Sequence, residues 1–205
     1  MTETKNTRCV VFVSLTGDEE IKLYDLDLAS GALQLRSTSN AYGPSGALCL
    51  HPSGNVILVA HVESATLASF RVDTNSGELT LINKVDTGIG TPAHLITDRA
   101  GRFLLTAYYG GGGVSVHRLG ADGAIHELVQ YVDTGEKAHS IVSAAGDRFV
   151  FVPHVCPTNK TSQFRFDGES GLLEPNDPAE LPPPDDQTGP RHICFRPQGD
   201  VAYIV

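Results

Sequence analysis

The sequence has 205 residues, of which 40% are hydrophobic and 19% are charged, and its formal net charge is −9. A chain of this length can bury one ordinary core, while the acidic excess argues against a nucleic-acid-binding or membrane-binding surface. No apolar run approaches the roughly 20 residues of a membrane span. The polar start MTETKNTRCV lacks the apolar run of a secretory signal, so we expect a cytoplasmic protein.

The four cysteines lie far apart, and none forms a CxxC pair. We therefore expect free thiols in a reducing compartment, packed as small buried hydrophobic side chains, with no zinc site. The residues concerned are Cys9, Cys49, Cys156 and Cys194.

Two series of glycine turns recur along the chain with nearly the same period. The first series separates pairs of short apolar runs, at spacings of 47, 45 and 53 residues, and consists of Gly54, Gly101, Gly146 and Gly199. The second series interleaves with the first at spacings of 46, 46 and 48 residues, and consists of Gly31, Gly77, Gly123 and Gly171. Two landmarks with one period indicate a repeated structural unit.

Each repeat contains four short strands, which we denote A to D in chain order. In the third repeat they are HLITD (94–98), FLLTAYY (103–109), VSVHRL (114–119) and IHELVQYV (125–132). The alternation in VSVHRL is typical of a half-buried strand, and the glycine turns predict tight A–B and C–D hairpins. No helical pattern of useful length occurs, so the sequence predicts an all-β fold, a β-propeller of four-stranded antiparallel blades.

The number of repeats is too small to close a ring. An incomplete first blade begins near Cys9, and the last blade stops at VAYIV, inside its own B strand. We therefore expect a single β-propeller domain over residues 1–205, truncated at its C-terminus, with about four and a half blades. Apolar residues that a further blade would cover should be exposed at the end: Ile193, Phe195, Tyr203 and Val205.

Strand direction predicts which residues gather near the axis. Because A–B and C–D turns share one face of the disc, the starts of A strands and the ends of B strands share the other. A-strand starts carry His94, His139, Arg191 and His192, and B-strand ends carry His61, Glu63, Tyr108, Tyr109 and His154. Arginine there can bind a carboxylate, a phosphate or a developing oxyanion, and histidines supply acid–base capacity. A multi-histidine metal site is the less favoured alternative.

Two further segments are interpreted as connections. YYGGGGV (108–114) lacks the helix and GK[ST] of a phosphate loop, so it is expected to be a B–C loop that needs glycine dihedrals. PNDPAELPPPDDQTGP (175–190) is expected to be an extended insertion between blades.

Three strings resemble the lactonase family of seven-bladed propellers, which includes propeller-type 6-phosphogluconolactonases and carboxy-muconate cyclases. They are TPAHLITDRAGRFLLTAYYGGGGVSVHRL, KAHSIV and GPRHICFRPQGDVAYIV, and the resemblance covers nearly the whole chain. It implies an active-site set of His139, Arg191, a glutamate and a later arginine. The glutamate belongs to an Asn-Glu pair expected directly after Val205, so the chain resembles a fragment.

The resemblance also marks two departures. Tyr108 stands where the family commonly has asparagine, and His154, with Lys160 nearby, stands where an acidic stretch is common. These exchanges bear on which lactone is the substrate and whether it is phosphorylated.

The function implied is hydrolysis of a small sugar-derived lactone, with no cofactor and no metal. His139 would be the general base and Arg191 the oxyanion-binding group, with substrate contacts from His94, His154, His192 and Tyr108. Two alternatives remain open: a cyclase that adds a carboxylate across a double bond, and a noncatalytic propeller that presents a binding rim.

Overall fold

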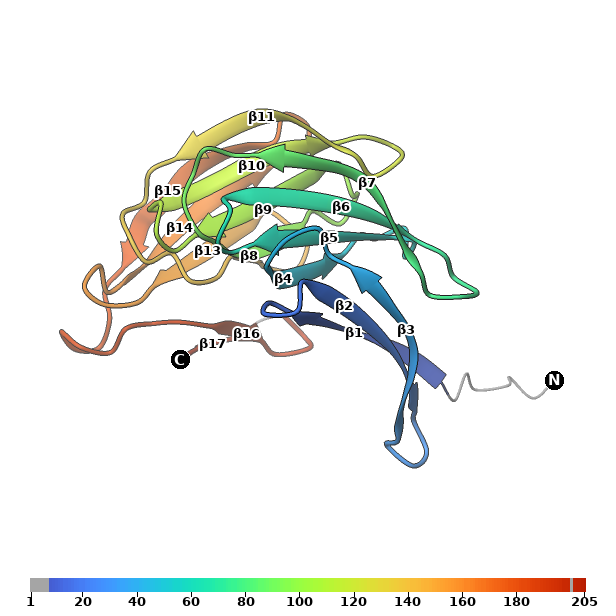
Figure 1. Cartoon of the computed structure of the whole chain (residues 1–205). Coiled ribbons are helices and arrows are strands. Elements are labelled where there is room, and N and C mark those ends of the chain that lie inside the picture. Colours follow the sequence, from blue (N-terminus) through green and yellow to red (C-terminus); the bar gives the residue numbers. More distant parts are fainter. Residues whose placement is uncertain (1–7, 200) are drawn as a thin grey trace.

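The computed structural model describes residues 8–199 and 201–205, which form 17 strands in five antiparallel sheets (Figure 1). The polar start (residues 1–7) and Asp200 of the last glycine turn lie outside the described residues. Among the described residues, no helix is long and apolar enough to cross a membrane. The predicted all-β propeller fold of four-stranded antiparallel blades is confirmed, as a partial ring.

The first two sheets are coloured from blue to green in Figure 1. The first sheet contains β1 (Arg8–Leu15), β2 (Glu20–Asp27) and β3 (Leu33–Asn40). The second contains β4 (Ser45–Leu50), β5 (Val56–His61), β6 (Thr66–Val72) and β7 (Leu79–Asp86). The C–D glycine turn at Gly31 joins β2 to β3, so the first sheet holds the equivalents of strands B, C and D.

The third sheet contains β8 (Pro92–Thr97), β9 (Phe103–Tyr108), β10 (Gly113–Leu119) and β11 (Ile125–Val132). The fourth contains β12 (Val142–Ser143), β13 (Phe149–His154), β14 (Lys160–Asp167) and β15 (Leu172–Leu181). The last contains β16 (Ile193–Phe195) and β17 (Ala202–Ile204). The sheets follow one another along an arc in chain order (Figure 1).

The hydrophobic core consists of layers between neighbouring sheets. Leu58 of β5 packs with Leu104 of the third sheet, whereas its neighbour Val59 packs with Ile21 of the first sheet. A further layer joins Phe103 and other residues of the third sheet to the fourth. Because successive side chains of a strand point to opposite faces, a strand that lies between two neighbouring sheets has both of its faces buried. This explains why all six residues of β5 and all six of β9 are buried.

Contacts between connections confirm the predicted assignment of faces. At the A–B turns, the ring Nε2 of His51 lies 2.9 Å from the carbonyl oxygen of Gly101. On the other face, the backbone N–H of Lys137, in a D–A connection, donates to the carbonyl oxygen of Tyr109 at 2.9 Å. The starts of A strands and the ends of B strands therefore share one face.

The glycine-rich B–C loop needs its glycines for two different reasons. Gly112 and Gly113 have φ angles of 65° and 152°, as the prediction of special dihedrals requires. Gly111 is needed because of space, since a Cβ there would lie 2.9 Å from the backbone N and O of Gly90. The loop thus packs directly against the preceding D–A connection.

The predicted insertion at 175–190 is partly wrong, because residues 175–181 continue strand β15. The register between β14 and β15 shifts between Ser162 and Phe164, and Thr161 then pairs with Leu181. Prolines are tolerated here because β15 is an edge strand, whose outward N–H positions need no partner. Only the segment from Pro182 onward connects the fourth sheet to the last.

The expectation of buried cysteines is also wrong for three of the four. All four are free, but Cys9, Cys156 and Cys194 are exposed, and only Cys49 is half-buried. Tyr203 and Val205 are exposed by 58% and 73%, as expected for the last sheet, whereas Ile193 and Phe195 are half-buried. The ring of Phe195 lies 5.9 Å from that of Phe151, so the fourth sheet already covers part of it.

Candidate active site

His139 and Arg191 are brought together across 52 residues of sequence. His139 lies in the connection before β12, where its N–H donates to the carbonyl oxygen of Pro153 at 3.0 Å. Arg191 lies before β16, and its Nε donates to Nε2 of His139 at 2.8 Å. Ser140 fixes this approach, because its hydroxyl donates to the carbonyl oxygen of Arg191 at 3.0 Å.

The hydrogen bond between the two side chains determines where the proton of neutral His139 resides. A guanidinium only donates, so Nε2 of His139 must accept with its lone pair. The ring proton is therefore on Nδ1, which is buried and has no hydrogen-bond partner. Burial lowers the pKa of His139, and the positive charges of Arg191, His192 and His94 lower it further.

Aromatic and cationic groups surround the pair. The rings of His192 and Tyr109 meet that of His139 edge to face, with centroid distances of 5.0 and 5.9 Å. Lys137 places its Nζ over the Tyr109 ring, 4.3 Å from the centroid, which fixes that ring by a cation–π contact. Cationic or titratable nitrogen groups therefore predominate at this end of the third and fourth sheets.

His94 is half-buried beside the cluster, from β8 of the neighbouring sheet. Its Nδ1 accepts the backbone N–H of Ile141 at 3.4 Å. Burial lowers the pKa of His94, and the charge of His192 lowers it further. His94 thus connects β8 to the chain that carries His139.

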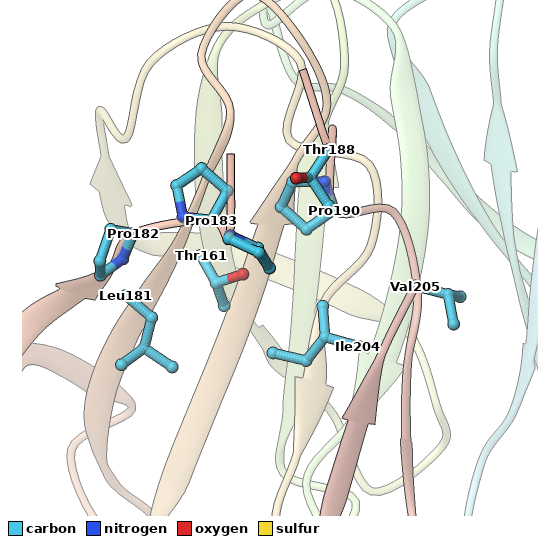
Figure 2. Close-up of a pocket in the computed structure, with 9 residues that line it drawn as sticks. Thr161, Leu181, Pro182, Pro183, Thr188, Pro190, Ile204 and Val205 are labelled. Carbon is cyan, nitrogen blue, oxygen red and sulfur yellow. The ribbon is translucent and has the colours of Figure 1, made fainter. Parts of the chain in front are cut away.

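A cavity of about 410 Å³ lies over the pair, lined by Tyr109, His139, Val155 and Arg191. A second hollow of about 320 Å³ lies between the 181–190 segment and β17, where Figure 2 shows proline rings with Leu181 and Ile204. Its lining contains no ionisable side chain, so it offers no group for acid–base chemistry. The cavity over His139 is the candidate active site.

Two predicted substrate contacts require correction. Tyr108 is fully buried, and its hydroxyl hydrogen-bonds with that of Ser115 at 2.8 Å. His154 is also fully buried, and its Nδ1 donates to the carbonyl oxygen of Glu136 at 3.1 Å. Neither side chain reaches the cavity in this structure. His154 instead supports the connection that carries His139.

His61 likewise lies inside the fold and not on the rim. It is fully buried, its Nε2 donates to the carbonyl oxygen of Ala41 at 2.8 Å, and its Nδ1 accepts from the Thr66 hydroxyl at 2.9 Å. His61 and His154 occupy equivalent ends of B strands, and each donates to the D–A connection before its own blade. Both histidines therefore have a structural role, since each holds a D–A connection to the end of a B strand.

Lys137 and Ser140, which lie beside His139 in KAHS, are two site residues that the sequence pattern did not predict. The feature that could have indicated them is their position beside a predicted A-strand start, because alternate side chains there contact the neighbouring blade. No group of three or more His, Cys, Asp or Glu side chains arranged to hold a metal ion occurs within residues 8–199 and 201–205.

The buried histidines predict a loss of stability in mild acid. Burial lowers the pKa of His61, His117 and His154 in the folded protein. Below about pH 6.5 the unfolded chain takes up protons that the folded chain does not, until the folded-state pKa is reached. The free energy of unfolding should therefore fall as pH falls from 6.5 to 5.5, by up to about 1.4 kcal/mol per unit for each histidine.

Urea unfolding at several pH values measures this loss. A His154→Gln variant keeps a donor for Glu136 without titrating, so its stability should depend less on pH. The exposed His126 supplies the matched control, His126→Gln, which should retain the full dependence. Equal dependence in all three proteins would show that burial of His154 does not contribute.

Comparison with known proteins identifies the family. The profile of the family described as "Lactonase, 7-bladed beta-propeller" matches residues 9–205. The chain belongs to this lactonase family. The family therefore accounts for the 46-residue repeat and the four-stranded sheets.

Named relatives agree with this lactonase assignment. A 6-phosphogluconolactonase of Pectobacterium carotovorum is 32% identical over 200 residues, which are 96% of this chain and 57% of the relative. One from Klebsiella pneumoniae is 29% identical over 195 residues, 95% of this chain and 57% of the relative. The solved structure of a periplasmic gluconolactonase from Pseudomonas aeruginosa superposes with a TM-score of 0.83 at 25% identity, covering 96% of this chain and 60% of that one. The chain thus spans less than two thirds of the length of these lactonases.

Proposed function

We propose that the protein is a lactone hydrolase that opens a sugar-derived lactone by attack of water. The observation that carries the proposal is the His139–Arg191 pair in a cavity of a lactonase-family propeller, joined at 2.8 Å. The names of the relatives further support a sugar lactone as substrate. The small-molecule lactone is the only partner that the proposal requires.

The arrangement suits acyl transfer to water. In the proposed mechanism, the lactone carbonyl oxygen meets Arg191, whose planar fork can stabilise the oxyanion that develops there. This contact draws the guanidinium from His139 and frees the lone pair on Nε2. His139 then takes a proton from the attacking water and returns it to the ring oxygen as the acyl–oxygen bond breaks.

The remaining side chains of the cluster position the substrate. His192 lies beside His139, and His94 contacts the backbone of Ile141 two residues further on, so both are proposed to orient the lactone relative to Nε2. We assign Tyr108 and His154 supporting roles, because their side chains are fully buried. No cofactor takes part in the proposed steps.

We also propose that the protein acts in the cytoplasm. All four cysteines are free and three of them are exposed, which suits a reducing compartment. The gluconolactonase neighbour from Pseudomonas aeruginosa is described as periplasmic, so cell fractionation is the direct test.

A pH-stat assay tests the reaction itself. The full-length protein should accelerate acid release from glucono-1,5-lactone or its 6-phosphate above the spontaneous rate, in proportion to protein concentration. A carboxy-muconate is offered in parallel, because turnover of that substrate alone would favour a cyclase. Folded protein that accelerates none of these reactions would contradict the proposal and favour a binding module.

A further inference from the structure

The His139–Arg191 hydrogen bond exists only while His139 is neutral. Nε2 of His139 accepts from Nε of Arg191, and a protonated imidazole has no lone pair to offer. Protonation would place two cations side by side and break the contact. The pair therefore has two arrangements: joined, with neutral His139 and one positive charge on Arg191, or separated, with a positive charge on each side chain.

The surroundings contain charge that an anion could complement. His139 faces Arg191, His192 and His94, which lower its pKa, and it touches the ring of Tyr109. No carboxylate is among the groups that shift its pKa. From the elements packed around it come two further cations, Lys137 over Tyr109 and Lys160, which is paired with Glu180.

The other titratable groups on these elements make contacts away from the His139–Arg191 pair. Glu136, on the same connection as His139, is exposed, and its carbonyl oxygen accepts from His154. The buried ring of His154 supports the backbone and does not reach the cavity. A cavity of about 410 Å³ with a guanidinium and an imidazole in its wall is thus open to an anionic group.

We propose that this cavity is a proton-linked oxyanion receptor, in which an anion draws Arg191 from His139 and His139 takes up a proton from solvent as the anion binds. The protonated Nε2 then donates to the same anion that Arg191 binds. The natural ligand is the carboxylate of the hydroxy-acid product, an assignment that rests on the proposed function. A phosphoryl group on the sugar presents the same chemistry.

The direction in which pH changes the affinity for anions follows from the linkage between anion binding and protonation of His139. Burial and the neighbouring cations hold the pKa of His139 low in the free protein, whereas a bound anion raises it. Between these two values the complex holds a proton that the free protein lacks. Affinity should therefore increase as pH falls through this window, by up to about tenfold per unit, and level off below the free-state pKa. The product should then inhibit more strongly in mild acid.

Calorimetry of the full-length protein tests proton uptake directly. Gluconate supplies a carboxylate and sulfate a tetrahedral oxyanion, and neither titrates between pH 5.5 and 8. Titrations in two buffers of different ionisation enthalpy give the number of protons taken up. We expect uptake of up to one proton and roughly fivefold or greater tightening from pH 8 to pH 6. Comparison of gluconate with 6-phosphogluconate shows which anionic group the site prefers.

Variants assign the effect to the pair. His139→Gln keeps an acceptor for Arg191 but does not titrate, so it should bind anions with no proton uptake. Arg191→Gln should lose anion binding at least tenfold, whereas His126→Gln, on the outer strand β11, should behave as wild type. Proton uptake that persists in His139→Gln, or no binding of any of these anions, would overturn the inference.

The result is independent of the lactonase assay. If the protein bound anions with proton uptake but did not open lactones, the receptor proposal would hold and the proposed function would be contradicted. If the protein opened lactones but its anion binding did not depend on pH, the proposed function would hold and the receptor proposal would be contradicted.

Discussion

Replacing Arg191 by lysine is expected to lower kcat/KM for lactone opening by about a hundredfold or more, comparable to the removal of one oxyanion donor. Lysine keeps the positive charge but loses the planar fork and the Nε that donates to His139. The backbone of residue 191 would still be held by Ser140, so the fold should survive. Initial rates of acid release measure the effect.

Arg99→Lys supplies the control for Arg191→Lys. Arg99 is exposed on the opposite face of the disc, beside the A–B turns, and should tolerate lysine without loss of rate. Wild-type turnover in a folded Arg191→Lys protein would show that the mechanism does not require the guanidinium.

His139→Ala is expected to lose about 10²- to 10⁴-fold in kcat, the contribution of a general base. The loss should be largest above the pKa of His139, where the wild-type imidazole is neutral and able to accept a proton. A wild-type rate that rises with pH through this pKa should become a flat profile in the variant. The full pH profile of kcat therefore distinguishes loss of a base from damage to the fold.

His126→Ala is the matched control for the histidine, because His126 is exposed on an outer strand. If His139→Ala kept both the rate and its pH dependence, another group would have to activate the water. His192 would then be the first candidate, since its ring lies 5.0 Å from that of His139.

The repeat made the fold predictable from the sequence. Two glycine series of one period gave the four-stranded unit, and the short turns fixed which connections share a face. Strand direction predicts His139 and Arg191 on the same face, and the structure joins them by a hydrogen bond. Strand order within a blade follows directly from short antiparallel connections, so little long-range information was needed.

The orientation of side chains at the ends of B strands was not predictable in the same way. Tyr108 and Tyr109 are adjacent, yet Tyr108 is buried inside the blade while Tyr109 lines the cavity. An uncertainty of one residue in the end of a strand exchanges the two faces. The same uncertainty placed His61 and His154 on the rim, although both point into the fold.

The exposed cysteines were missed for a related reason. Cys9 and Cys194 belong to β1 and β16, whose sheets stand at the two ends of the arc. Composition alone favours burial of a thiol, but it does not show which strands have a neighbour on both sides.

The alternation of core contacts along β5 has a consequence for how the sequence can change. Leu58 and Val59 are adjacent, but they belong to different layers, one shared with the third sheet and one with the first. Leu58 instead shares its layer with Leu104, one repeat away. We therefore expect a larger side chain at position 58 to be compensated within its own layer, which includes Leu104, and not by Val59, its neighbour in the chain. Compensating substitutions in this protein should therefore join residues of one sheet or of adjacent repeats that share a layer, and not adjacent residues of one strand.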